Sequence, residues 1–472
     1  MLGVVASCGF LLYRVEPDVE GKPLYEDEAI AGLIAMRPLG EVLETVLVDR
    51  GGAPLHFVLA HAAFRVDASA DTLRWLSVLA ALAAVPLCFD LARRLDGVGA
   101  GIGAAAVAAS STALAIYGSF GRMYALLVLV AALFSDLFVR ALQVRTRGAV
   151  AAAAAAGWLL VAVHPYGVVP AFVALVAAAV IWRGRGLGSA VPVAIATLAA
   201  VPFLVADLRL ADRSAVGSEG KQLASPGEAW DQLVAAVSAF AGGDGLPLLF
   251  FTTLALIGLV LLVRREAAVA ALAFSMVIPP LLFVFVRTDT APDLSPRHLF
   301  FGLPLWAAAI GIGASTLARR SPLVLALIAL IAFVSPASAL RDPREFGFGS
   351  ASRDEAPVIH ARENDLLLPY SAVFLAALPD VRRALALPHG PGDEILRALE
   401  HADEPVGAVY MAVPTEPWTV RRLEGPFDKP GALTAAAETV HAYEGTPELR
   451  DWLAWIEPGL CEALRELDRA CP

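Results

Sequence analysis

The feature that most constrains this chain is a series of apolar windows, each about 20 residues long, that recur before Leu340. A helix of that length crosses a hydrocarbon layer roughly 30 Å thick. In lipid each backbone amide must find its hydrogen-bond partner within its own segment, so these windows can only be helices. The chain is 58% hydrophobic and 17% charged, which argues against an ordinary soluble domain. The sequence therefore predicts an all-α polytopic membrane protein.

The windows predict about eleven membrane spans. They are Leu2 to Leu12, Trp75 to Leu91, Ala100 to Tyr117, Tyr124 to Leu142, Ala149 to Val163, Val168 to Ile181, Ser189 to Val205, Leu246 to Val263, Ala267 to Val286, Leu299 to Leu317 and Leu323 to Ala339. The first window is short. A cleaved signal peptide is the alternative for that stretch, although it lacks the charged n-region of such a peptide.

Basic residues between alternate windows predict the orientation. They are Arg93 and Arg94, then Arg140, Arg145 and Arg147, then Arg183 and Arg185, then Arg264 and Arg265, and finally Arg319 and Arg320. By the positive-inside rule, these loops lie in the cytoplasm. The first loop (residues 14–73), the other alternate loops and the tail after Leu340 then face outward. We expect a multi-pass protein of the plasma (inner) membrane.

The first outward loop contains two short helices that are not expected to span. Apolar residues from Leu39 to Leu47 follow a helical period, with acidic residues opposite them, so this piece is expected to lie on the membrane surface. Pro54 to Val66 is too short to cross the bilayer and predicts a second juxtamembrane helix.

The tail after Leu340 is charged and rich in proline. It carries 13 Arg and Lys against 23 Asp and Glu, so it accounts for the net charge of −10, and nothing in this balance favours nucleic-acid binding. Its apolar runs predict strands at Asp365 to Tyr370 and Val406 to Val413, with helices at Asp393 to His401 and Glu448 to Asp468. We expect a transmembrane domain (residues 1–340) followed by a small extracytoplasmic α/β domain (residues 341–472), in which Cys461 and Cys471 could form a disulfide.

Three carboxylates, Glu26, Asp27 and Glu28, follow the first window. A partly desolvated carboxylate at the rim of a membrane cavity can deprotonate an acceptor hydroxyl. The alternative is structural, because acidic residues at the start of a helix favour its dipole. Adjacent helical side chains point about 100° apart, so Asp27 and Glu28 are not expected to share one task.

Cationic side chains fall at the outer ends of several windows. Arg122, His164 and Arg297, with His298 beside it, could hold the phosphate of a carrier lipid through charge-assisted hydrogen bonds. The alternative is that each side chain only reaches toward the interface. His56 and His61 are expected to be surface or packing residues.

Several short motifs occur in a fixed order: Tyr-Glu-Asp-Glu-Ala (25 to 29), Gly-Gly-Ala-Pro-Leu-His-Phe (51 to 57), Leu-Arg-Trp-Leu-Ser-Val-Leu (73 to 79), Tyr-Gly-Ser-Phe-Gly-Arg-Met-Tyr-Ala-Leu (117 to 126) and Pro-Arg-His-Leu-Phe-Phe-Gly-Leu-Pro (296 to 304). This layout resembles the GT-C glycosyltransferases related to protein O-mannosyltransferases and the bacterial aminoarabinose transferase. The resemblance covers about the first 340 residues.

The resemblance implies an inverting transfer from a polyprenyl-phosphate sugar, with Asp27 as the general base and Glu28 as a supporting acid. Arg122 and Tyr124 match the second-loop motif of that family. Phe120 stands where the family often has an acidic residue, so we name no metal cofactor.

We therefore expect a membrane glycosyltransferase that acts at the outer face on a glycan, lipid or protein acceptor. A transporter or lipid-sugar flippase is the alternative, although inverted repeats and broken spans, which are typical of transporters, are not evident in the sequence. A non-catalytic assembly partner of the same fold is a third hypothesis. The sequence does not identify the sugar or the acceptor.

Overall fold

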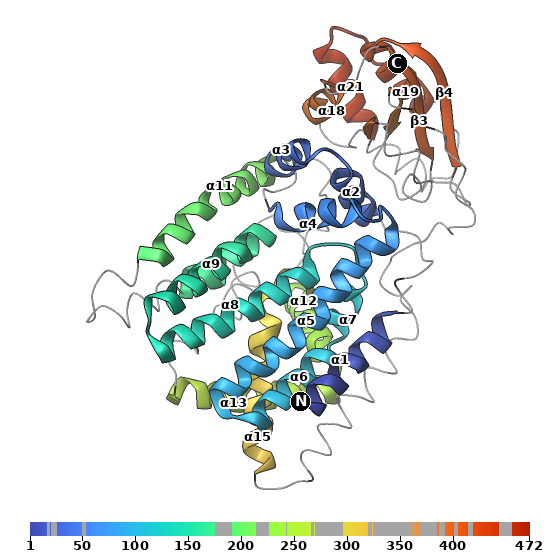
Figure 1. Cartoon of the computed structure of the whole chain (residues 1–472). Coiled ribbons are helices and arrows are strands. Elements are labelled where there is room, and N and C mark those ends of the chain that lie inside the picture. The colour runs from blue at the N-terminus through green and yellow to red at the C-terminus, as the bar shows by residue number, and fades with distance from the viewer. Residues whose placement is uncertain are drawn as a thin grey trace.

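The computed structural model describes residues 1–16, 19, 26–49, 53–174, 191–213, 226–241, 243–265, 269, 296–319, 323, 361–362, 364–368, 385–386, 392–400, 405–413, 419–442 and 456–472. Helices make up most of this part of the chain, and a small α/β unit lies at one end of the helical bundle (Figure 1). This arrangement confirms the predicted fold class.

Ten of the described helices form the bundle. They are α1 (Leu2–Val15), α5 (Ala70–Asp96), α6 (Val98–Ser110), α7 (Thr112–Gly118), α8 (Tyr124–Val144), α9 (Arg147–Val163), α11 (Val191–Arg213), α12 (Pro226–Ala241), α13 (Leu246–Arg265) and α15 (Leu303–Ala318). Two short 3₁₀ turns, η2 (Pro165–Gly167) and η4 (Pro296–Gly302), lie beside the ends of α9 and α15. The end of the window Val168 to Ile181 and nearly all of Ala267 to Val286 and Leu323 to Ala339 lie outside the described residues.

Four helices of the described part are long and apolar enough to cross a membrane: Asp71–Asp96, Tyr124–Val144, Leu246–Arg265 and Leu299–Ala318. The consecutive helices α6 and α7 are apolar enough to cross together, but they meet at an angle of 58°, so the pair is either a broken span or a re-entrant loop. The window Ala100 to Tyr117, which was predicted as one span, therefore contains two helices and a bend that the sequence did not show. Ser111 lies between the two helices, and its hydroxyl caps α7 by accepting from the Leu114 amide at 3.3 Å.

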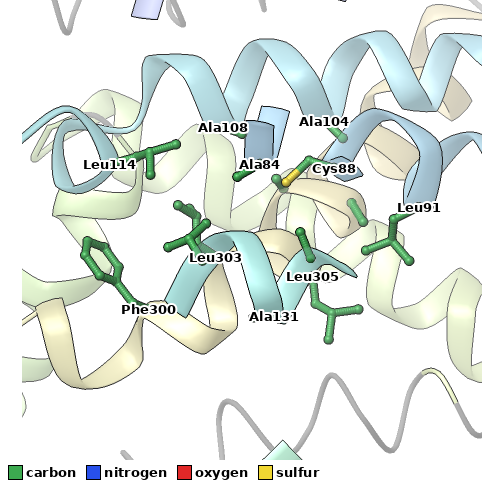
Figure 2. Close-up of a cluster of buried hydrophobic side chains, with 14 of the residues drawn as sticks. Ala84, Cys88, Leu91, Ala104, Ala108, Leu114, Ala131, Phe300, Leu303 and Leu305 are labelled. Carbon is green, nitrogen blue, oxygen red and sulfur yellow. The ribbon is translucent and has the colours of Figure 1, made fainter. Parts of the chain in front are cut away.

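Small residues let the bundle helices approach closely. A Cβ atom added to Gly311 would collide with the backbone of α6 at Ala100, and one added to Gly313 would collide with the backbone of α13 at Leu254. Such close backbone contact is a common means of packing helices in a membrane, where the hydrophobic effect between helices is absent. Around it, α5, α6, α8 and α15 bury a continuous apolar core that includes Cys88, Leu114 and Phe300 (Figure 2).

One end of the bundle is closed by arginine–carboxylate pairs. Arg94 at the end of α5 pairs with Asp136 on α8 at 2.6 Å and with Asp90 at 2.7 Å. Asp96 pairs with Arg265 at the end of α13 and with Arg319 after α15, the latter at 3.1 Å. These arginines were predicted to lie on one side of the membrane from charge alone, and the structure places them at one end of the bundle.

The opposite end carries a layer of three short helices, α2 (Glu26–Ala35), α3 (Leu39–Asp49) and α4 (Leu55–Phe64). The last two confirm the two helices expected in the first loop. A second apolar cluster joins this layer to the C-terminal unit, because Phe57 and Phe64 of α4 share a core with Leu367 and Tyr410. The C-terminal unit and the first loop therefore lie on the same side of the bundle (Figure 1).

The C-terminal unit contains a four-stranded sheet in the order β2-β1-β3-β4. The strands are β1 (Leu366–Leu368), β2 (Leu385–Ala386), β3 (Val406–Val413) and β4 (Thr419–Phe427); β1 is parallel to β2 and β3, whereas β3 and β4 are antiparallel. The helices are α18 (Gly392–Glu400), α19 (Lys429–His441) and α21 (Ile456–Glu466), and Cys461 of α21 forms a disulfide with Cys471. The two predicted strands correspond to β1 and β3, and the two predicted helices correspond to α18 and α21. The polar strand β4 and helix α19 were not predicted.

Candidate functional site

The first loop reaches the bundle through α2, which begins at Glu26. The three carboxylates therefore occupy the first turn of a helix, where negative charge is favourable. The side chains of Glu26 and Asp27 lie outside the described part of the structure. The side chain of Glu28, by contrast, is described and is 1% exposed.

Glu28 forms a buried ion pair with Arg74 of α5. The Arg74 guanidinium donates through Nε to Glu28 Oε1 at 3.0 Å and through Nη2 to Glu28 Oε2 at 2.9 Å. Its Nη1 also donates to the carbonyl oxygen of Val19 at 3.3 Å. This two-pronged geometry is the strongest arrangement available to a guanidinium and a carboxylate. It fixes α2 against the start of α5.

Glu28 also reaches the loop that joins α7 to α8, which the sequence analysis predicted to be the second outward loop. The backbone amide of Gly121 donates to Glu28 Oε1 at 2.6 Å. The sequence has Phe120 where an acidic residue was expected from the resemblance, yet the fold places the carboxylate of Glu28 beside that loop. Because Arg74 and Gly121 both bind this carboxylate, the geometry suits a positioning role better than the supporting acid predicted from sequence.

Aromatic side chains cluster where the second loop meets α8 and η4. The Tyr117 ring lies 5.1 Å from Tyr124 and 4.9 Å from Phe300 in edge-to-face geometry, and Phe120 stacks on Tyr124 at 6.3 Å. Phe120, Tyr124 and Phe300 are all buried. Such edge-to-face and offset pairs hold rings in defined orientations. The cluster gives Tyr124 a fixed place at the end of the bundle.

Two of the predicted cations lie against this aromatic cluster. The Arg297 guanidinium carbon is 6.0 Å from the centre of the Tyr124 ring, a cation–π distance. The His164 ring is 6.0 Å from Tyr124 and 4.7 Å from Tyr166. Residues that are far apart in sequence, His164, Tyr124 and Arg297, therefore meet at the end of the bundle opposite the arginine–carboxylate pairs.

The hydrogen bonding of His164 defines its chemistry. Its Nδ1 accepts from the backbone amide of Tyr166 at 3.2 Å. A neutral imidazole that accepts through Nδ1 carries its proton on Nε2. The backbone of Tyr166 therefore fixes the tautomer of a neutral His164 ring beside Tyr124.

The structure brings the predicted site residues together in two groups, and it does not describe the side chains of two others. Tyr124, His164 and Arg297 lie together, while Glu28 and the backbone of the 121–122 turn form the second group. Arg122 belongs to this turn, and its carbonyl oxygen accepts from the Ser77 hydroxyl at 3.2 Å. The side chains of Asp27 and His298 lie outside the described residues, so their roles stay predictions.

Arg14 is a buried charge that the sequence analysis did not identify. It lies in the last turn of α1, is 6% exposed, and donates through Nη1 to the carbonyls of Ala109 and Ser111 at 3.0 and 3.2 Å. These carbonyls belong to the break between α6 and α7, where the helical hydrogen bonds are interrupted. Arg14 therefore compensates the break with side-chain hydrogen bonds, as the interior of a membrane protein requires.

Among the described residues, no group of three or more His, Cys, Asp or Glu side chains could hold a metal ion.

The helical bundle, the juxtamembrane layer and the C-terminal α/β unit together define a polytopic membrane protein with the GT-C fold. The chain is similar to the structure of ArnT from Cupriavidus metallidurans bound to undecaprenyl phosphate, with a TM-score of 0.59 and 15% identity over 87% of this chain and 93% of that one. ArnT in the apo state has a TM-score of 0.56 and 14% identity, over 87% of this chain and 92% of that one.

The oligosaccharyltransferase AglB from Archaeoglobus fulgidus, in complex with an inhibitory peptide and a dolichol-phosphate, is also similar. Its TM-score is 0.50 with 12% identity, over 88% of this chain and 69% of that one. No protein-family model matches the chain, and no curated protein matches it in sequence. At these identities the likeness establishes the fold.

Proposed function

We propose that this chain is a glycosyltransferase that moves a sugar from a polyprenyl-phosphate carrier to an envelope acceptor at the outer face of the membrane. The observation that carries the proposal is the meeting of Arg297, His164 and Tyr124 at the end of a GT-C bundle, beside the loop held by α2. A structure with the same fold, ArnT, is bound to undecaprenyl phosphate. Cations at this depth suit the phosphate of such a lipid.

In the proposed reaction, each site residue has one role. The acceptor hydroxyl loses its proton to the Asp27 carboxylate as its oxygen attacks the anomeric carbon of the sugar. The bond from that carbon to the phosphate oxygen breaks, configuration inverts, and the polyprenyl phosphate leaves with the bonding electron pair. Arg122, His164, Arg297 and His298 bind the phosphate and stabilise its negative charge, while Tyr124 holds Arg297 in place. Glu28 positions the second loop.

The outward orientation is part of this proposal. The positive-inside pattern places the arginine–carboxylate end in the cytoplasm. The disulfide between Cys461 and Cys471 supports it independently, because disulfides persist in oxidising compartments. The C-terminal unit shares a core with α4, so the disulfide and the first loop lie on one side.

The broken span of α6 and α7 is the feature that favours the second candidate, a lipid-sugar flippase, because transporters often bind substrate at broken helices. The break leaves α7 only 7 residues long, which places it near the outer end of the span. In ATP-free nanodiscs, the purified protein should convert polyprenyl-phosphate sugar and a crude envelope acceptor fraction into free polyprenyl phosphate and a glycosylated acceptor. Movement of intact lipid-linked sugar across vesicles, with no carrier released, would contradict the transferase and support the flippase.

A further inference from the structure

His56 on α4 is more deeply buried than a surface histidine. It is 1% exposed, and its ring is hydrogen-bonded to the backbone of Gly121. Its Nε2 has no hydrogen-bond partner, so the nitrogen that donates to the Gly121 carbonyl is Nδ1. Burial, together with the positive charge of Arg122, lowers the pKa of His56 to about 3. The ring is therefore neutral near pH 7.

The Gly121 peptide is held from both sides. Its carbonyl accepts from His56 of α4, and its amide donates to Glu28 of α2 at 2.6 Å. The next carbonyl, that of Arg122, accepts from Ser77 of α5 at 3.2 Å. Three elements thus fix three consecutive peptide groups, and the backbone from which the Arg122 side chain projects has a defined orientation.

The turn also requires glycine at position 121. A Cβ atom there would lie 2.8 Å from Cγ of Leu73 and 3.1 Å from Oε1 of Glu28. Any larger residue would push the loop away from α2 and α5. The close fit shows that the loop is packed against its three supports, so the hydrogen bond from His56 acts on a backbone with little freedom to compensate.

We propose that His56 is a positioning residue for the donor phosphate, which acts by holding the Gly121 carbonyl and so aiming the Arg122 guanidinium. The inference rests on the proposed function, in which Arg122 binds that phosphate. A guanidinium binds phosphate well only when its planar donors are correctly oriented. The neutral ring supplies a hydrogen bond without adding a second positive charge beside Arg122.

The test compares variants that keep or lose the donor at the position of Nδ1. The amide of asparagine can replace Nδ1–H, whereas phenylalanine keeps the ring and loses the donor, and glutamine moves its amide toward the Nε2 position. We would measure the Kd for polyprenyl-phosphate sugar, kcat, and thermal unfolding of the purified full-length chain. His56→Phe and His56→Gln should weaken donor binding about 3- to 10-fold, the effect of losing one hydrogen bond, and His56→Asn should restore binding to within about 2-fold.

A double-mutant cycle separates positioning from general destabilisation. Arg122→Lys should weaken donor binding, and in that background His56→Phe should add less than about 2-fold, because both changes act on one contact. His61→Phe is the matched control on the same helix, since His61 bonds the carbonyl of Ala35 at 2.9 Å and not the second loop. His61→Phe should leave donor binding unchanged, both in the wild type and in the Arg122→Lys background.

Three results would overturn the inference: normal binding by both His56→Phe and His56→Gln, equal losses in His56→Asn and His56→Phe at unchanged folding, or effects of His56→Phe and Arg122→Lys that simply multiply. If His56→Phe does not fold, His56→Gln takes its place as the variant without a donor at the Nδ1 position and is compared with His56→Asn. A wild-type chain that neither binds nor consumes the donor would refute the proposed function itself, whereas a functional wild type with no coupling would refute only the role of His56.

Discussion

The two ends of the bundle use arginine in different ways. At one end, Arg94 and Arg319 pair with the carboxylates of Asp136 and Asp96, and these pairs join α5 to α8 and α15. At the other end, Arg297 lies over the ring of Tyr124, and His164 lies beside the same ring. The first arrangement satisfies each charge with an opposite charge and ties helices together. The second holds Arg297 and His164 against a rigid aromatic surface.

If the proposed function holds, the comparison separates arginines that tie helices together from one that binds the donor, although both look alike in sequence. Arginines at helix ends satisfy the positive-inside rule whether they bind a ligand or not. A guanidinium paired with carboxylates serves to tie helices together. In the proposed function, Arg297, which lies against the Tyr124 ring, serves instead to bind an anion. Donor recognition should therefore depend on the aromatic end alone.

The largest expected effect is at Asp27. If its carboxylate removes the acceptor proton, Asp27→Asn should lower transfer by roughly 10²- to 10⁴-fold, the usual contribution of a general base. Donor binding and thermal unfolding should be unchanged. Near-normal turnover would show that the carboxylate is not the base, and would leave Asp27 only its place in the first turn of α2.

The second prediction concerns the buried pair at the aromatic end. Arg74→Met leaves the carboxylate of Glu28, which is 1% exposed, without its counter-charge. Breaking such a buried pair costs about 3–5 kcal/mol, so the midpoint of denaturant unfolding in detergent should fall sharply. The matched control is Arg319→Met at the opposite end, where the arginine side chain is 59% exposed and the pair is worth at most about 1 kcal/mol. Equal decreases in the unfolding midpoint for Arg74→Met and Arg319→Met would show that burial of the ion pair does not determine its contribution to stability.

The third prediction tests how Arg297 binds. A guanidinium that grips a phosphate through two hydrogen bonds cannot be replaced by an ammonium of equal charge, whereas a side chain that only reaches the interface can. Arg297→Lys should weaken binding of polyprenyl-phosphate sugar by about 10- to 100-fold, with unfolding unchanged. Unchanged affinity would remove Arg297 from the phosphate site.

The smallest effect is expected for the corresponding change at the opposite end. Arg319→Lys keeps a positive charge beside Asp96, and the Arg319 side chain is 59% exposed while Asp96 also pairs with Arg265. The free energy of unfolding should therefore change by less than about 1 kcal/mol. Donor affinity should equal that of the wild type. A loss comparable to that of Arg297→Lys would mean that the two ends are not functionally distinct.

The sequence predicted those features that depend on short-range pattern. Window length and hydropathy identified α5, α8, α13 and α15, and the helical period from Leu39 to Leu47 identified α3. The strand β4 was not predicted, because its sequence is charged and contains glycine and proline, which are unfavourable in strands. Its place in the sheet comes from pairing with β3. The break at Ser111 also escaped, because its polar residues look unremarkable within an apolar window.

Contacts between distant segments could not be predicted. Glu28 and Arg74 both occur in motifs noted in the sequence, but spacing does not show that they form a pair across 46 residues. His56 was expected to pack or to face solvent, and only the fold shows that it bonds the second loop. The sequence did contain one signal of the aromatic cluster, because Tyr117, Phe120 and Tyr124 fall close together between the end of α7 and the start of α8.

The central claim is that the aromatic end faces outward, where the proposed donor site must lie. Gly40 on α3 and Gly148 at the start of α9 lie at opposite ends of the bundle, and a Cβ atom added to either meets open space. In intact cells, an impermeant thiol reagent should label Gly40→Cys and leave Gly148→Cys unlabelled until the membrane is permeabilised, with the wild type as the control for native cysteines. Labelling of Gly148→Cys alone would place the aromatic end in the cytoplasm and contradict the account.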